Sequence, residues 1–178
     1  MNLKEKYQRQ IIPIMKEKFG YRNDLAVPKI QKVVINTGIG KYRQDQRALD
    51  EIEHDLTLIT GQKPKKTQAK KAISAFKTRK GMVVGMAVTL RKQRMYDFLD
   101  RLIDLTLPRT RDFRGIDLKA IDQFGNLTIG IKEHIVFPEI SHENIYIIFG
   151  LEVCIVTTAK TKEEGSELFR LLGFPLKK

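Results

Sequence analysis

Three stretches of the sequence alternate large apolar residues with small or polar ones, which is the pattern of β-strands that bury one face. They are residues 82–91, 126–132 and 145–157. In the first stretch, the side opposite the apolar residues carries Gly85, Ala87 and Thr89. Residues 29–38 are rich in Val and Ile and predict another strand, and a short one is expected over residues 62–69. The sequence therefore predicts a sheet with one core face and one face of small or polar residues.

Between these strands, apolar residues recur at spacings of three and four, which predicts amphipathic helices. The predicted helices are residues 2–19, kinked at Pro13 and closed by Gly20; a helix capped by Asp45 that ends at Gly61; residues 92–107, which should stop at Pro108; and a last helix, opened by the capping box of Thr161 and Glu164 and closed by Gly173.

This order of elements predicts an α+β fold, with a mostly antiparallel sheet in a single domain over residues 1–178. Helices should cover one face of the sheet and leave the other open, as in ferredoxin-like and RNA-recognition-like folds. Small side chains on the open face would let a nucleic-acid backbone approach closely. The pattern alone also fits an ordinary solvent-facing side of an antiparallel sheet. Residues 70–81 form a basic loop with few apolar residues, and we expect its tip to be mobile.

The chain is strongly basic, and its positive charge is concentrated in one part. It has 33 Lys and Arg against 21 Asp and Glu, a formal net charge of +12. Residues 56–96 contain no acidic residue, whereas they contain Lys63, Lys65, Lys66, Lys70, Lys71, Lys77, Arg79, Lys80, Arg91, Lys92 and Arg94. Such a block predicts a polyanionic partner, because neutralised phosphates release their counterions. The alternative is a solvated face that only keeps the protein soluble.

Composition excludes several classes of protein. A hydrophobic content of 42% with 30% charged residues is typical of a folded chain and not of a disordered one. No stretch approaches the roughly 18 to 20 consecutive apolar residues of a membrane span, and residues 1–20 lack the apolar core of a signal peptide. Cys154 is the single cysteine, so it cannot form an internal disulfide. We therefore expect a cytoplasmic protein without a membrane partner.

No group of residues predicts catalysis, a cofactor or a metal. The turn at residues 38–41 lacks the third glycine of a dinucleotide motif and the Gly-Lys-Ser/Thr of a P-loop. His134, Glu139 and His142 fit no helical two-histidine ligand pattern, so we interpret them as surface or structural residues. Cys154 lies within a predicted strand and not at a helix amino terminus, where a reactive thiolate is favoured. The sequence predicts a protein that is not an enzyme.

Few aromatic residues accompany the basic ones. Phe76 lies within the basic loop, and no aromatic pair lies on the outward sides of the strands, so base stacking is not supported. We therefore expect structured RNA and neither single strands nor DNA. In a folded RNA, uncharged polar side chains can bind ribose hydroxyls and base edges. Asn36, Gln62 and Thr89 are such residues, each within or beside a predicted strand.

Five motifs occur in an order and spacing that match a known family. They are residues Val34–Gly40, Thr60–Pro64, Lys71–Gly81, Leu107–Gly115 and Val136–Ile140. On these motifs the chain resembles, over nearly its whole length, the bacterial-type family of large-subunit ribosomal protein five, which binds 5S rRNA. The resemblance implies a ribosome-bound protein of the central protuberance, with 5S rRNA, large-subunit rRNA, peptidyl-site tRNA and small-subunit protein thirteen as partners.

The resemblance also implies roles for particular residues. The implied 5S rRNA-binding residues are Asn36, Gln62, Thr89, Lys63, Arg91 and Lys32. The implied tRNA-contacting residues of the loop are Lys77, Thr78, Arg79 and Lys80. The implied residues of an intersubunit bridge to small-subunit protein thirteen are Arg109, Arg111, Arg114, Glu139 and Glu143. Two other hypotheses stay open on the residues alone: a non-specific RNA chaperone and a phosphate-handling enzyme.

Overall fold

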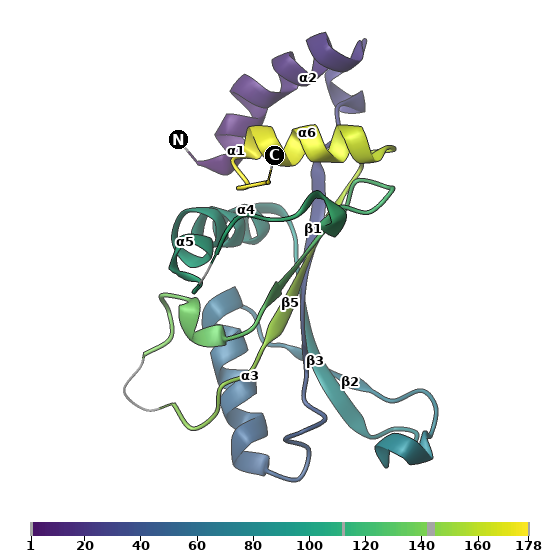
Figure 1. The fold of residues 1–178 in the computed structure, drawn as a ribbon, viewed down its shortest axis with the longest axis vertical. Coiled ribbons are helices and arrows are strands. Elements are labelled where there is room, and N and C mark those ends of the chain that lie inside the picture. The colour runs from purple at the N-terminus through teal and green to yellow at the C-terminus, as the bar shows by residue number, and fades with distance from the viewer. Residues whose placement is uncertain (1, 112, 142–144, 178) are drawn as a thin grey trace. The chain divides into compact units, whose positions relative to one another are not determined.

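The computed structural model describes residues 2–111, 113–141 and 145–177 of the chain. Its strands form a five-stranded antiparallel sheet in the order β2-β3-β1-β5-β4 (Figure 1). The strands are β1 (Ile30–Gly38), β2 (Lys65–Gln68), β3 (Val83–Leu90), β4 (Leu127–Ile131) and β5 (Leu151–Thr157). Helices accompany this sheet, so the predicted α+β fold is confirmed.

The helices begin and end largely where the capping signals predict. The α-helices are α1 (Leu3–Lys6), α2 (Ile12–Phe19), α3 (Gln46–Thr60), α4 (Lys92–Arg101), α5 (Leu107–Arg109) and α6 (Lys162–Leu172). Short 3₁₀ turns are η2 (Asp24–Ala26), η3 (Ser74–Phe76), η5 (Leu118–Ala120) and η6 (His134–Val136), and π-helical turns are η1 (Tyr7–Ile11) and η4 (Leu102–Thr106). The Asp45 carboxylate accepts a hydrogen bond from the Ala48 N–H at 3.1 Å, which confirms the predicted cap of α3. No helix within the described ranges is long and apolar enough to cross a membrane.

Two helices accommodate an internal proline after a π-helical turn. η1 precedes α2, in which Pro13 is the second residue, and η4 precedes α5, in which Pro108 is the second residue. Proline lacks an N–H and its ring crowds the carbonyl four residues earlier, so a wider turn relieves the crowding. The irregularity expected at Pro13 takes this form. The stop predicted at Pro108 is wrong, because the helix continues to Arg109.

The last strand is shorter than predicted, because the chain leaves the sheet before Leu151. The backbone N–H groups of Tyr146 and Ile147 donate to the Glu51 carboxylate of α3 at 2.9 and 3.3 Å. These backbone groups are therefore not available to a strand ladder. The prediction of a strand over residues 145–150 is wrong for this reason.

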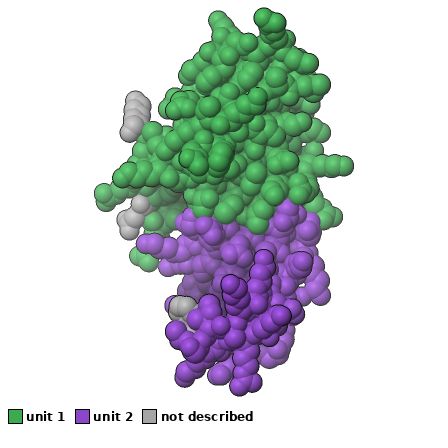
Figure 2. Space-filling view, turned by 90° about the vertical axis from the view of Figure 1, so that its right-hand side faces the viewer, with its two compact units in different colours: residues 1–34, 90–129, 153–178 green, residues 35–89, 130–152 purple. Residues whose placement is uncertain are grey.

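The chain divides into two compact units, which Figure 2 colours separately. Unit 1 comprises residues 1–34, 90–129 and 153–178, and unit 2 comprises residues 35–89 and 130–152. In unit 1, Met15, Leu99 and Phe169 are 0% exposed and belong to its core. The prediction of a single domain over residues 1–178 stays a prediction.

In unit 2, helix α3 covers one face of the strands. Ile52 and Leu56 of α3 and Ile35 of β1 are fully buried in the core of this unit. The two faces separate at consecutive residues of β2. Lys66 reaches the α3 carboxylate of Glu53 at 2.8 Å, whereas Thr67, the next residue, points away from the helix. We call the face turned away from α3 the outer face.

Candidate nucleic-acid interface

The outer face of β1 carries polar and small side chains because the second half of the strand alternates. Val33, Ile35 and Thr37 are buried, whereas Asn36 and Gly38 between and beyond them are exposed. Thr37 is buried as a polar residue because its hydroxyl donates to the Gly150 carbonyl at 2.6 Å. The predicted RNA-binding residue Asn36 therefore lies on the outer face.

Close packing between β2, β3 and β1 surrounds Asn36. Thr67 of β2 pairs with Gly85 of β3. A Cβ atom at Gly85 would lie 2.8 Å from Thr67 Oγ1 and 3.0 Å from the Thr37 carbonyl oxygen. Only glycine fits there, and the Asn36 amide oxygen lies 3.8 Å from the same point. The lack of a side chain at Gly85 therefore leaves room for Asn36 on this face.

The structure brings Gln62 and Thr89 together at one end of β3. The Thr60 hydroxyl accepts a hydrogen bond from the Gln62 N–H at 3.2 Å, which holds the turn after α3. The Gln62 side-chain amide then donates to the Thr89 carbonyl at 3.5 Å. Thr89 itself is exposed between buried Val88 and Leu90. Gln62 and Thr89 are thus neighbours, as a shared binding role requires.

The cations of the predicted set occupy different places. Lys63 and Lys66 flank Glu53 of α3 at 3.0 and 2.8 Å, and their hydrogen bonds hold the pKa of the Glu53 carboxyl below its usual value. Lys63 therefore lies beside α3, although its side chain is 80% exposed. Lys32 is half-buried and Arg91 is exposed, and both belong to unit 1, whereas Asn36, Gln62 and Thr89 belong to unit 2.

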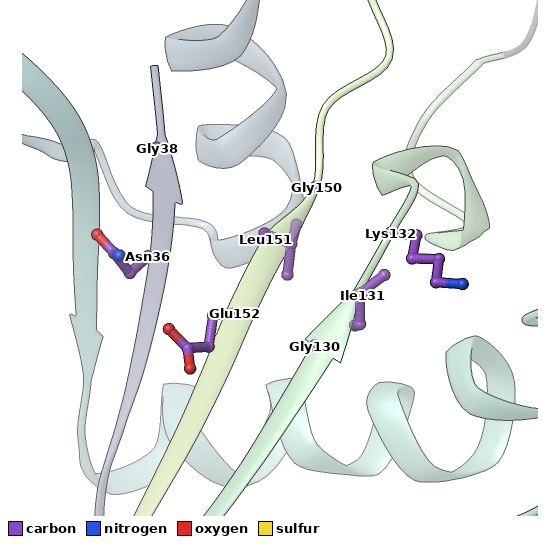
Figure 3. A pocket seen from close by; sticks show the side chains of 8 residues that line it. All are labelled: Asn36, Gly38, Gly130, Ile131, Lys132, Gly150, Leu151 and Glu152. Carbon is purple, nitrogen blue, oxygen red and sulfur yellow. The ribbon is translucent and has the colours of Figure 1, made fainter. Parts of the chain in front are cut away.

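A hollow of about 450 Å³ lies on the outer face of unit 2 (Figure 3). Its lining residues come from β1, β4, β5 and the residues beside them, and they are Asn36, Gly38, Gly130, Ile131, Lys132, Gly150, Leu151 and Glu152. Sequence reasoning proposed only Asn36 of these as a site residue. Glu152 was detectable in principle, because it lies between the buried residues Leu151 and Val153 of β5 and must point outward.

The basic loop is an ordered extension of the β2–β3 hairpin. Ala69 and Met82 are joined by a backbone hydrogen bond of 2.8 Å, and Ile73 and Thr78 exchange two bonds of 3.1 and 3.2 Å nearer the tip. Lys77 has a positive φ of 49°, which closes the tip after η3. Of the predicted tRNA-contacting residues, Lys77, Arg79 and Lys80 are exposed and Thr78 is half-buried. Mobility of the tip stays a prediction.

The predicted bridge residues do not belong to one unit. Arg109, Arg111 and Arg114 are exposed in unit 1, whereas Glu139 is half-buried in unit 2. Glu143 lies outside the described residues. The structure therefore does not bring this set together.

The candidate metal residues include a buried histidine with a structural role. His134 is 0% exposed, stacks on Phe149 with ring centroids 4.0 Å apart, and places Nε2 3.1 Å from Asp55 Oδ2 of α3. Its Nδ1 accepts from the Phe149 N–H at 3.4 Å, which assigns the proton to Nε2. His134 thereby links η6 to α3, as its structural interpretation predicts. His142 lies outside the described residues.

The pair formed by Asp55 and His134 predicts a dependence of stability on pH. Burial acts to raise the pKa of Asp55, but the hydrogen bonds from His134 and His54 outweigh it, so the pKa lies below the usual value. A carboxyl whose pKa is lowered by folding stabilises the protein above its unfolded pKa, about 4, and this stabilisation is lost as the pH falls through the folded pKa. Urea unfolding below about pH 4 should show a steeper loss in the unaltered protein than in Asp55→Asn. Parallel curves would contradict this assignment.

The fold and this surface define a class: a cation-rich α+β protein with an outer sheet face suited to RNA. The comparisons with known proteins then give the family. The model described as Ribosomal protein L5 matches residues 23–79, and the model that describes the C-terminus of the same ribosomal protein family matches residues 83–176. The chain belongs to the ribosomal protein L5 family, and the predicted family is thereby confirmed.

Relatives along nearly the whole chain support this membership. Proteins named large ribosomal subunit protein uL5 are 54% identical over 175 residues in Desulforapulum autotrophicum and 53% identical over 175 residues in Syntrophomonas wolfei, with 98% of each chain covered in both cases. The protein of that name from Caldanaerobacter subterraneus is 49% identical over 176 residues, which cover 99% of this chain and 98% of the relative.

Family membership settles three predictions. The chain is a structural constituent of the ribosome and not an enzyme, which removes the hypothesis of a phosphate-handling enzyme. Ribosomal RNA is its expected partner. Its predicted location, bound to cytoplasmic ribosomes, is confirmed by the same membership.

Proposed function

We propose that this chain binds 5S rRNA within the large ribosomal subunit and attaches it in the central protuberance. The observation that carries the proposal is the group of uncharged polar side chains on and beside the outer face of unit 2, namely Asn36, Gln62 and Thr89. Such side chains can bind base edges and ribose hydroxyls, which a purely electrostatic surface cannot select. The names of the relatives, which place those proteins in the large subunit, support the same reading.

Cations would supply the sequence-independent part of the affinity. Lys63, Lys32 and Arg91 extend the proposed 5S rRNA-binding set, and large-subunit rRNA is a second RNA partner in this proposal. The exposed cations of the loop, Lys77, Arg79 and Lys80, are assigned with Thr78 to peptidyl-site tRNA. Acid-free, outward and on a hairpin extension, they are suited to a backbone contact that does not read sequence.

The proposal extends to an intersubunit bridge with small-subunit protein thirteen. Exposed Arg109, Arg111 and Arg114 support it for unit 1, and Glu139 is the proposed bridge residue in unit 2. Glu143 completes the proposed set from the sequence.

A salt titration tests 5S rRNA binding against non-specific attachment. Purified protein is titrated with 5S rRNA and with a tRNA of similar charge, at low salt and at about 0.15 M salt. Electrostatic attachment alone weakens steeply and similarly for both RNAs as salt rises. We expect 5S rRNA to keep a large advantage at the higher salt. Equal collapse of both affinities would overturn the proposal in favour of a non-specific RNA chaperone.

A further inference from the structure

Glu152 is an acidic residue on a face that we propose binds a polyanion. It is exposed on β5 and lines the hollow of the outer face together with Asn36 and Lys132. Figure 3 shows its carboxylate pointing toward β1, the strand of Asn36. A carboxylate next to phosphates is unfavourable unless it accepts hydrogen bonds from donors on the partner.

Two glycines of the same hollow have no structural reason to be glycine. A Cβ atom at Gly38 or Gly130 would meet nothing within 4 Å, and neither residue has a positive φ. Glycine within a strand is destabilising relative to residues with side chains, by roughly 0.5–1 kcal/mol relative to Ala. A strand glycine without a packing or backbone requirement is typical of a site where another backbone approaches closely.

The donors that RNA offers decide what Glu152 can bind. Phosphate oxygens only accept hydrogen bonds, so they suit the exposed Lys132 ammonium and not a carboxylate. RNA presents its 2′-hydroxyls in a wide and shallow minor groove, at the level of the sugar-phosphate backbone. A 2′-hydroxyl can donate to a carboxylate, and the small residues of the hollow permit an approach at that depth.

We propose that the hollow holds one ribose-phosphate unit of ribosomal RNA, in which Glu152 accepts a hydrogen bond from the 2′-hydroxyl, Lys132 pairs with the phosphate, and Gly38 and Gly130 allow the close approach. Glu152 is then a residue that selects RNA over DNA. The inference rests on the proposed RNA-binding function of the outer face. The ribose can belong to 5S rRNA or to large-subunit rRNA, and both RNAs are tested.

The substitution Glu152→Gln separates this inference from simple electrostatics by the sign of its effect. If the carboxylate only repels phosphates, its removal tightens RNA binding. If it accepts from a ribose, its removal weakens binding to at least one of the two RNAs, by roughly tenfold, because charge-assisted hydrogen bonds are the stronger ones. Glu163→Gln, which removes the same charge from an exposed position of α6, is the matched control and should not weaken either RNA.

Transcripts with scattered 2′-deoxy nucleotides test the bonded atom. Bound and unbound fractions of 5S rRNA and of large-subunit rRNA are compared for the unaltered protein and Glu152→Gln. We expect at least one position at which the deoxy sugar weakens binding of the unaltered protein but not of the variant. Identical interference patterns, or equal or tighter RNA binding by Glu152→Gln, would overturn the inference.

The glycines give a second and independent arm. Gly38→Ala and Gly130→Ala should weaken the same RNA several-fold while the urea midpoint stays equal or rises, because the added methyl groups meet open space in the free protein. Gly40→Ala is the control, since its Cβ would also meet open space but the residue lies outside this hollow. Unaltered protein that fails to prefer 5S rRNA over tRNA would instead contradict the proposed function itself.

Discussion

Replacing Gly165 with alanine is expected to destabilise the protein by about 3 kcal/mol or more, because the added methyl group has no space. A Cβ atom on Gly165 of α6 would lie 2.6 Å from the Gly125 carbonyl oxygen and 2.8 Å from its carbonyl carbon. These are backbone atoms, and Thr157 Oγ1 holds the same carbonyl by a hydrogen bond of 2.8 Å. The helix would have to move away from the turn before β4, and urea unfolding measures the cost.

Gly40→Ala is the control for this substitution. It makes the same change at an exposed glycine whose Cβ would meet no atom within 4 Å. We expect its unfolding free energy to stay within about 0.5 kcal/mol of the unaltered protein. If Gly165→Ala were as stable as Gly40→Ala, the close contact between α6 and Gly125 would be wrong.

Asn36→Ala is expected to weaken 5S rRNA binding by about 1–3 kcal/mol, which is roughly 5- to 150-fold in Kd. The amide lies on the outer face of β1, and its removal would leave a buried RNA group without a partner. Gln62→Ala and Thr89→Ala should each have an effect in the same range. Filter binding at about 0.15 M salt measures the change, because non-specific attachment is then weakened.

Two further variants give this prediction its controls. Gln31→Ala removes an exposed amide from the same strand, but position 31 shares the face of buried Val33 and Ile35, so 5S rRNA binding should be unchanged. The triple substitution of Lys77, Arg79 and Lys80 by alanine should also spare 5S rRNA and weaken tRNA contact instead. A triple variant that lost 5S rRNA affinity as badly as Asn36→Ala would show that the proposed division between outer face and loop is wrong.

Local patterns predicted the elements whose determinants are close in sequence. The caps at Asp45 and Thr161 accept hydrogen bonds from N–H groups three residues later. The left-handed residues Gly20, Gly61 and Gly173 follow the ends of their helices. The alternation in β1 assigned Asn36 to the exposed side without any knowledge of its neighbours. These signals depend on geometry within a few residues, which the sequence states directly.

The errors arose where a distant residue decided the local structure. Residues 145–150 alternate like a strand, but Glu51 takes the backbone N–H groups of Tyr146 and Ile147. Pro108 has the signature of a helix end, and the preceding π-helical turn allows the helix to continue. His134 could not be assigned a partner from the sequence, because Asp55 is far away along the chain and adjacent only in the fold.

The sequence by itself determined the α+β class, the order of elements, the acid-free basic segment and the family motifs, because each of these is a property of composition or short spacing. Only the tertiary structure decided which glycines are crowded and which are open: Gly165 meets backbone at Gly125, whereas Gly38 and Gly130 meet nothing within 4 Å. Likewise, only the fold placed Glu152, Asn36 and Lys132 around one hollow. The physical reason is that packing and hydrogen bonding between distant segments depend on three-dimensional proximity, which periodicity along one chain does not contain.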